Sequence, residues 1–317
     1  MTVTDRPTGY AQISMHPSGQ VQPQSPVPRV AQAPRLVRPQ GWPDELMGEL
    51  SLRVDVRGAR SVAVEQFHSG ALRVVRPLYL DTSGQVCYTV INPGGGYVAG
   101  DDYLMEMDVL PGASMLLTSQ AATKIYRTAG QPVRQHTNAR VGAGALFESI
   151  PDQIIAYRDA VYIQTSTVEV DPEGSYIAGE VVTPGWAPDG SLFEYEKIVL
   201  RTDVIRPGQS VPVLVDALVL EPSAMDVSGL GGLDSHTHVG TLLAVDRRVD
   251  ADLVREIGEF AERFPELLVG VSLAPGPALA LRVLGNNTEV ITNLLLDVDA
   301  HLRRSWFNQD RIDFRKQ

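Results

Sequence analysis

Apolar and polar residues alternate along most of this chain between residues 49 and 243, the pattern of half-buried β-strands. In the first such segment Leu52, Val54 and Val56 alternate with charged residues. Turn sequences containing glycine or proline separate the segments at intervals of about ten residues. The clearest strand patterns lie at 52–56, 86–90, 104–109, 160–170, 197–204 and 211–220. This spacing predicts β-sheets packed on one another.

Two segments near the end have the period of an amphipathic helix. In residues 250–264 the apolar side chains share one face, glutamates lie opposite, and Pro265 ends the pattern. In residues 287–307 apolar side chains again recur at helical spacing, and Asn286 with the glutamate three residues later predicts an N-terminal cap. Residues 279–284, between the two segments, predict a strand. The expected fold class is mainly β, a β-rich α+β protein with two C-terminal α-helices.

The first 43 residues differ in composition from the rest of the chain. They contain eight of the 22 prolines, many glutamines and serines, and Asp5 as their one acidic residue. Proline removes a backbone donor and blocks regular structure. We therefore expect a disordered, slightly basic tail over residues 1–43 and a single domain over residues 44–317.

Composition places the domain among soluble globular proteins, with 44% hydrophobic and 21% charged residues. The sequence contains neither a secretory signal pattern nor an apolar run near the roughly 20 residues that span a bilayer. Cys87 is the only cysteine, which excludes an internal disulfide and a cysteine-cluster metal site. We expect a cytoplasmic protein without a membrane partner. The net charge of −11 argues against a nucleic-acid partner, because phosphate contacts need clustered lysine and arginine.

A glycine cluster at residues 94–96 invites comparison with phosphate-binding loops. A dinucleotide-binding fingerprint would need a third glycine where Ala99 stands. A P-loop would need a lysine where Asp101 stands, and an aspartate there repels phosphate. Residues 103–109 then alternate as a strand and offer no helix N-terminus. The cluster is not a nucleotide site.

The segment from residue 92 to residue 127 instead resembles the signature region of the UreD family, also called UreH, of urease accessory proteins. That pattern is a Gly-Gly run, Gly-Asp, a strand, Pro-Gly-Ala, and then Thr-Thr-Gln-x-x-x-Lys-x-Tyr-Arg. Ser119 replaces the second threonine and keeps its hydroxyl group. The residues that match are Gly94, Gly95, Gly100, Asp101, Pro111, Gly112, Ala113, Thr118, Gln120, Lys124, Tyr126 and Arg127. The resemblance covers roughly residues 50–305.

The resemblance implies a fold of stacked, helically wound β-sheets with a pair of helices. It also implies a non-enzymatic maturation factor that docks on the urease apoprotein and recruits UreF and the GTPase UreG. No tightly bound cofactor is expected, but Ni²⁺ is expected to pass transiently through a polar interior. Oxygen ligands suit such a path because they hold the ion weakly. The residues proposed for it are Asp101, Glu148, Asp152 and the region of Lys124 and Tyr126.

Residues 180–195 depart from the commoner pattern of the resembled family. The usual arginine and glutamate are missing, and Ser191 stands at the position of that glutamate. Asp189 and Glu194 are alternative carboxylates for its role. Trp186 lies beside two prolines, where it is either a core residue or an interface anchor.

The main alternative function is a metal-dependent hydrolase that uses His236 and His238. Alternate residues of a strand point to one face, so both imidazoles of an H-x-H pair can reach one ion. Such an enzyme needs further ligands after the pair, and the only later histidine is His301. A third hypothesis is a nickel store, suggested by the acidic charge. The polar string from Thr118 to Arg127 contains no serine-nucleophile motif, which indicates a non-catalytic role.

Overall fold

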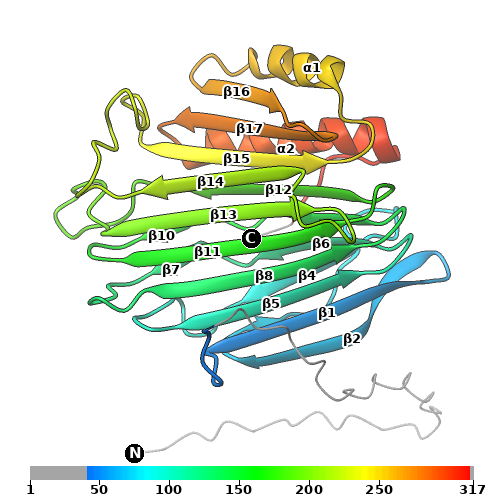
Figure 1. The fold of residues 1–317 in the computed structure, drawn as a ribbon, viewed down its shortest axis with the longest axis horizontal. Helices are drawn as coiled ribbons and strands as arrows, with labels where there is room; N and C mark the ends of the chain where they lie inside the picture. The colour runs from blue at the N-terminus through cyan, green and yellow to red at the C-terminus, as the bar shows by residue number, and fades with distance from the viewer. Residues whose placement is uncertain (1–40, 315–317) are drawn as a thin grey trace, which may run out of the picture.

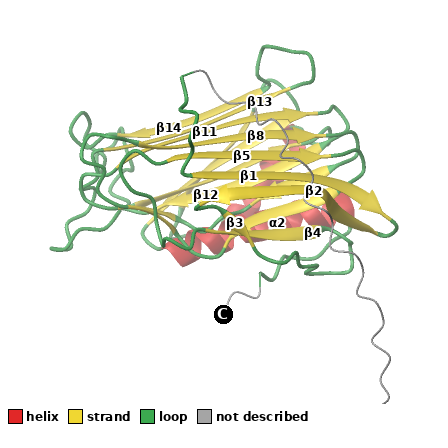
Figure 2. Cartoon of the chain, turned by 90° about the horizontal axis from the view of Figure 1, so that it is seen from below, coloured by secondary structure: helices red, strands yellow, loops and turns green. Residues whose placement is uncertain are grey.

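Two large β-sheets stack face to face, and two helices lie beside one of them (Figures 1 and 2). This computed structural model describes residues 41–314. The predicted tail therefore lies outside the described residues, except for residues 41–43. Within those three, Trp42 contacts the ring of His136 and the guanidinium group of Arg134.

The first sheet has seven strands. They are β1 (Gly48–Arg57), β2 (Arg60–Gly70), β5 (Asp102–Val109), β8 (Val133–Val141), β11 (Val161–Val170), β13 (Lys197–Ile205) and β14 (Leu214–Leu220). Their spatial order is β14-β13-β11-β8-β5-β1-β2. The five central strands run parallel, and the edge strands β2 and β14 pair antiparallel with their neighbours.

The second sheet has ten strands. Its main path consists of β3 (Arg73–Val74), β4 (Val86–Ile91), β6 (Ser114–Ser119), β9 (Leu146–Ser149), β12 (Ser175–Val182), β15 (His238–Val245), β16 (Leu268–Leu273) and β17 (Ala278–Gly285). Their order is β16-β17-β15-β12-β9-β6-β4-β3. Two short strands lie off this path, with β10 (Ile154–Ala156) pairing to both β12 and β7 (Thr123–Ile125).

The chain winds from one sheet to the other and back. β4, β6, β9 and β12 belong to the ten-stranded sheet, whereas β5, β8, β11 and β13 belong to the seven-stranded sheet. Each turn of this winding adds one parallel strand to each sheet, and the strand in the opposite sheet supplies the long crossover that parallel pairing requires. The stacked, helically wound sheets implied by the family resemblance are confirmed.

The main hydrophobic core lies between the inner faces of the two sheets and includes Leu50, Met107 and Tyr162. A second core lies between the ten-stranded sheet and the helices. The helices are α1 (Ala251–Ala261) and α2 (Thr288–Phe307), close to the predicted segments. Neither of these, within residues 41–314, is long and apolar enough to span a membrane.

The N-terminal cap of α2 differs by one residue from the prediction. The side chain of Asn287 accepts the backbone N–H groups of Glu289 and Val290. The carbonyl oxygen of the Asn286 side chain accepts instead from the backbone N–H of Thr237, in the turn before β15. The sequence pattern does not distinguish these two neighbouring asparagines, and the path of the backbone determines which of them caps the helix.

Candidate functional site

A cavity of about 120 Å³, lined by both apolar and polar side chains, lies between the two sheets. A site for one water molecule needs roughly 10–15 Å³ measured in this way, so the space is large enough for several. Side chains from both sheets line it, and we call it the inner cavity. Its polar lining residues are Tyr97, Thr118, Ser119, Thr123, Gln135, Thr137, Ser149, Asp152, Gln164, Ser166, Tyr176, Glu180, Thr202 and Thr241.

One part of the lining is polar because neighbouring parallel strands place polar residues at the same level. Gln135 of β8 lies directly beside Gln164 of β11. Two residues further on, Thr137 lies beside Ser166, which lies beside Thr202 of β13. These side chains point toward the ten-stranded sheet and line the inner cavity. The seven-stranded sheet thus contributes amide and hydroxyl groups to the inner cavity.

Glu180 of β12 supplies a carboxyl group to the inner cavity. The side-chain amide of Gln164 donates a hydrogen bond of 2.8 Å to Glu180 Oε2, and Gln164 in turn accepts from the hydroxyl of Tyr162 at 2.9 Å. Burial raises the pKa of Glu180 to about 7, opposed by the Gln164 hydrogen bond, with smaller effects from Asp216, which raises it, and Arg282, which lowers it. The carboxyl group therefore exchanges protons near neutral pH.

An ion pair closes one side of this region. Arg282 of β17 donates to Asp216 of β14 at 2.6 Å and to the hydroxyl of Thr241, a cavity-lining residue of β15, at 2.7 Å. The contact joins β14, at the edge of one sheet, to β15 and β17 of the other. It fixes the carboxylate of Asp216 and the guanidinium group near Glu180.

A second hollow of about 190 Å³ adjoins the inner cavity, and we call it the outer chamber. The two spaces share four lining residues, Val90, Tyr97, Ser119 and Thr123. Gly95, Gln120 and Lys124 of the family motif also line the outer chamber. Residues of the family motif therefore line the outer chamber, and the walls of the outer chamber and the inner cavity have residues in common.

Tyr126 packs against the glycine cluster, which accounts for part of the motif. A Cβ atom on Gly96 would lie 2.5 Å from Tyr126 Cε2, so a glycine is required for this ring position. The backbone of Tyr126 also donates to the carbonyl of Tyr97 at 2.9 Å. Arg127, the last motif residue, forms a surface ion pair with Asp159 at 3.1 Å.

Asp101 is buried and holds the loop after the glycine cluster. Its Oδ2 atom accepts from the backbone N–H of Val98 and from the hydroxyl of Tyr103, both at 2.8 Å. Gly100, directly before it, has φ of 81°. The ring of Tyr103 stacks on that of Tyr97, whose hydroxyl donates to Gln135 of the inner cavity. Asp101 thus supports the cavity wall but does not line the cavity.

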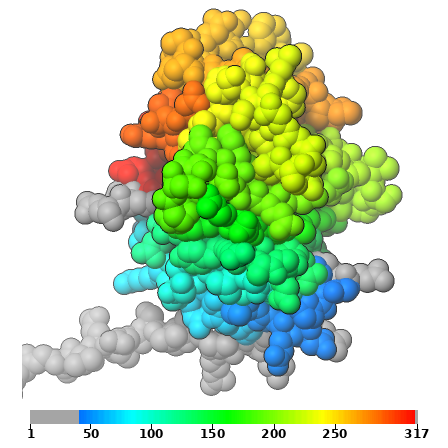
Figure 3. Space-filling view, turned by 90° about the vertical axis from the view of Figure 1, so that its left-hand side faces the viewer, coloured from blue at the N-terminus to red at the C-terminus, as the bar shows by residue number. Residues whose placement is uncertain are grey.

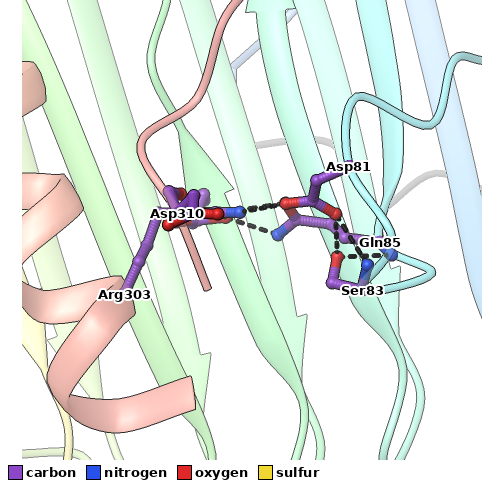
Figure 4. A network of polar contacts seen from close by, with 6 residues as sticks. Asp81, Ser83, Gln85, Arg303 and Asp310 are labelled. Carbon is purple, nitrogen blue, oxygen red and sulfur yellow. Dashed lines mark hydrogen bonds and ion pairs between the residues drawn. The ribbon is translucent and has the colours of Figure 1, made fainter. Parts of the chain in front are cut away.

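Glu148 lies on the opposite face of β9 from the inner cavity. It is completely buried and pairs with the equally buried Arg303 of α2. Arg303 also donates to Gln85 and to Asp81, each at 3.0 Å (Figure 4). The structure therefore places Glu148 in a polar network that attaches α2 to the sheet, away from Asp101 and Asp152.

Asp152 is the predicted path residue that borders the inner cavity. Its backbone N–H donates to Ser119 Oγ at 2.8 Å, and Thr118 Oγ1 donates to the carbonyl of Ile150 at 2.7 Å. The motif hydroxyls on β6 thus fix the turn that carries Asp152. The backbone N–H of Gln120 donates to Val90 at 3.0 Å, which ties the same segment to β4.

His236 and His238 do not form part of a larger ligand cluster. His236 Nδ1 contacts the carbonyl of Leu233 at 3.0 Å, and His238 Nδ1 contacts the hydroxyl of Thr237 at 2.7 Å. Burial lowers the pKa of His238. Among residues 41–314 no three His, Cys, Asp or Glu side chains gather in a geometry that holds a metal ion. Within the described residues, the further ligands that the hydrolase hypothesis requires do not gather around this pair.

Residues 186–194 form a loop in which Ala187 is buried and most other side chains are exposed. Trp186 keeps 50% of its surface exposed, so it is not a core residue. Asp189 and Glu194, the alternative carboxylates of this segment, both pair with Arg158, at 2.7 and 3.3 Å. They face the surface, whereas Glu180 faces the inner cavity. The sequence pattern did not identify Glu180, because a glutamate next to a valine run matches a solvent-facing strand position equally well.

Comparison with known proteins agrees with this architecture. A family described as UreD urease accessory protein matches residues 47–316. The chain is 52% identical over 269 residues to the urease accessory protein UreD of Actinomyces naeslundii, covering 85% of this chain and 98% of that relative. The chain is also 41% identical to the urease accessory protein UreD of Corynebacterium glutamicum and 34% identical to that of a Bacillus species. Each match again covers 85% of this chain and 98% of the relative. This chain therefore belongs to the UreD family of urease accessory proteins.

Proposed function

We propose that this chain is a non-enzymatic scaffold in the cytoplasm that docks on the urease apoprotein, recruits UreF and UreG, and passes Ni²⁺ through its interior. The observation that carries the transit step is the inner cavity, whose partly polar lining includes one carboxyl group at Glu180 and another at Asp152. Nickel is the cargo of this route and not a resident cofactor.

The chemistry of the lining suits transit better than storage. Hydroxyl, amide and carboxyl oxygens dominate the polar side chains of the inner cavity, and they bind a borderline metal ion more weakly than thiolates or imidazoles do. Weak sites permit release. The absence of a cluster of three ligands within residues 41–314 points the same way, since a nickel store would need a closed site.

The pKa of Glu180 gives this route a physical basis for loading and release. At about 7, the carboxyl group is partly ionised at neutral pH, and an arriving dication favours the ionised form. Asp152 borders the same cavity on the side of the motif residues. We assign Asp101 and Glu148 to the support of this architecture, because hydrogen bonds and an ion pair already occupy them.

Urease activity in cells tests the proposed function. The urease subunits, UreF and UreG are expressed with nickel, with and without this chain, and urease protein is matched by immunoblot. Activity that requires the chain, together with recovery of UreF and urease on a tagged version of it, is the expected result. Equal activity in both cultures would contradict a maturation role and return attention to His236 and His238.

A further inference from the structure

β16 (Leu268–Leu273) is the outermost strand of the ten-stranded sheet, and within residues 41–314 it pairs with β17 alone. It consists of leucine, valine, glycine and serine, without a charged residue or a proline. Its register with β17 continues over the whole strand without a bulge. In the space-filling view, the gold and orange segments that include α1 and β16 form one end of the molecule (Figure 3). One edge of β16 therefore lies at the surface with no neighbouring strand among those described.

The other edge strands on the main paths of the two sheets have features that discourage pairing with another chain. β2 contains charged residues such as Glu65, and its ladder with β1 has a bulge at Arg53/Val54. β3 is only two residues long. β14 directs the carboxylate of Asp216 inward to Arg282. β16 has none of these features, so its own sequence does not oppose pairing along the outer edge.

The backbone of β16 alternates between groups that bond to β17 and groups that point outward. The phase of this ladder is fixed just beyond the strand, where Ala274 donates its backbone N–H to the carbonyl of Ala278 at 2.8 Å. Counting back by two, the even-numbered residues of β16 bond to β17. The odd-numbered residues Val269, Val271 and Leu273 therefore direct their N–H and C=O groups outward, where they can pair with another strand.

The surroundings of this edge are apolar and open. Leu268 is 50% exposed and Leu273 is 46% exposed. α1 packs on the face of β16 that belongs to the second core, and its Glu256 contacts His301 of α2 at 3.2 Å. Gly258 lies on the opposite flank of α1, with open space at its Cβ position. The helix thus presents a small residue to a molecule that approaches the edge of β16.

The outer edge of β16 is complementary to itself. In an antiparallel pair of two copies centred on Val271, the two Val271 residues lie opposite each other and Val269 lies opposite Leu273. All three outward-facing residues then form backbone hydrogen bonds with the second copy, because they occupy hydrogen-bonded positions of the new ladder. In the same register Leu268 lies opposite Ala274, so the exposed leucines meet apolar partners.

Charge does not oppose this arrangement locally, although the chain carries a net charge of −11. The charged residue nearest to the strand is Glu266, and in this register it faces residues 274–277 of the second copy, which are alanine, proline and glycine. A pair with two-fold symmetry also uses the free edge of each copy completely, so it closes at two chains. A second copy therefore fits the edge in backbone pattern, apolar contact and charge.

We propose that two copies of this chain pair through β16, antiparallel and centred on Val271, so that one β-sheet continues across both copies. The proposal goes beyond the proposed function and does not depend on it, because the pairing needs neither urease nor nickel.

Sedimentation velocity of the purified full chain over a range of concentrations tests the pairing, and we expect conversion of the monomer to a species of twice its mass. Val271→Pro removes an outward-facing N–H group and leaves the bonds to β17 in place, so it should raise the dissociation constant about tenfold or more. Leu273→Lys places a charge at the same edge and should also weaken the pair. The matched control is Val219→Lys on β14, where the valine is 47% exposed, and it should leave the pair unchanged.

Disulfide trapping tests the register of the pair. Gly270 of one copy lies opposite Ser272 of the other, whereas identical positions are diagonal neighbours about 7–8 Å apart, too far for a disulfide. Chains with Gly270→Cys and chains with Ser272→Cys, distinguished by two tags, should therefore crosslink to each other on mild oxidation when mixed. Either variant alone should crosslink far less.

Three results would overturn the proposal. The first is a chain that stays monomeric at every concentration, with no crosslink between the mixed cysteine variants. The second is a dimer that neither Val271→Pro nor Leu273→Lys weakens, which would place the contact elsewhere. The third is an open series of larger species, since a pair through β16 closes at two chains. Circular dichroism of each variant verifies that the sheets remain folded.

Discussion

The carboxyl group of Glu180 is buried and accepts a hydrogen bond from Gln164, and the balance between these two effects sets its pKa. Loss of solvation favours the neutral carboxyl group, and the amide donor favours the ionised one. The neutral form gains overall, which raises the pKa to about 7. A carboxyl group with this property makes the stability of the protein depend on pH.

Glu180→Gln is expected to remove part of that dependence. Between pH 4.5 and about 7 the folded state binds more protons than the unfolded state, so the free energy of unfolding falls as pH rises through this window. At about pH 8 the variant should be more stable than the parent by on the order of 2 kcal/mol, and the gap should close in acid. Urea unfolding at several pH values measures this, with the exposed Glu173→Gln as control. Parallel pH profiles of parent and Glu180→Gln would contradict the assignment.

The ring of Tyr126 leaves no room for a side chain at Gly96, so a substitution there should lower the free energy of unfolding. Gly96→Ala places a Cβ atom 2.5 Å from the ring and 2.9 Å from the carbonyl of Lys124, so we expect a loss of about 1–3 kcal/mol in the free energy of unfolding. Gly258→Ala, in α1 with open space around its Cβ position, should instead stabilise by about 0.5–1 kcal/mol. Thermal unfolding compares the two. Equal effects of both substitutions would show that the contact with Tyr126 is unimportant.

At the scale of single elements, α2 is attached by charge as well as by apolar packing. Arg303 is 1% exposed and pairs with the fully buried Glu148 and with Asp81 (Figure 4). Asp299, one turn earlier, is also fully buried, and burial together with the charge of Glu148 holds its pKa well above the ordinary value. The single guanidinium group therefore compensates a largely acidic pocket.

Removal of that guanidinium group should detach the end of the helix. Arg303→Met leaves buried carboxyl groups without their cation, and we expect a loss of about 3–5 kcal/mol. Arg304→Met, the adjacent and exposed position, should change the free energy of unfolding by less than about 0.5 kcal/mol. Hydrogen exchange of the α2 backbone amides localises the effect. Unchanged exchange in Arg303→Met would contradict the attachment.

The elements themselves were largely predictable, because each depends on local pattern. The apolar face of 287–307 and the closing proline at 265 defined both helices to within a few residues. The sequence was less informative about which face of each strand points into the molecule. In β11 both faces carry polar residues, since Gln164 and Ser166 point inward and Thr165 and Thr167 lie between them. Alternation alone gives no means of telling a cavity-lining residue from a solvent-facing one.

At the scale of the whole molecule, the winding of the chain creates the inner cavity. Side chains from β8 and β11 meet others from β6, β9 and β12 only because successive turns stack in register. These pairings join segments distant in sequence, so the residues that line the cavity together could not be grouped from the sequence. Asp152 was identified through the family resemblance, and Glu180 required the structure.

The most direct test of transit through the inner cavity is the nickel content of urease that has matured with a variant in which this cavity is blocked. Ser166→Leu places an apolar side chain in the inner cavity, whereas Thr167→Leu, the next residue of β11, changes the outer face of the same strand. Urease is purified from nickel-supplied cells that express each variant with UreF and UreG, and nickel per active site is measured. Transit through the inner cavity predicts a strong loss of nickel per active site with Ser166→Leu and near-parental loading with Thr167→Leu. Full loading with both variants, at equal amounts of folded protein, would contradict transit through the inner cavity.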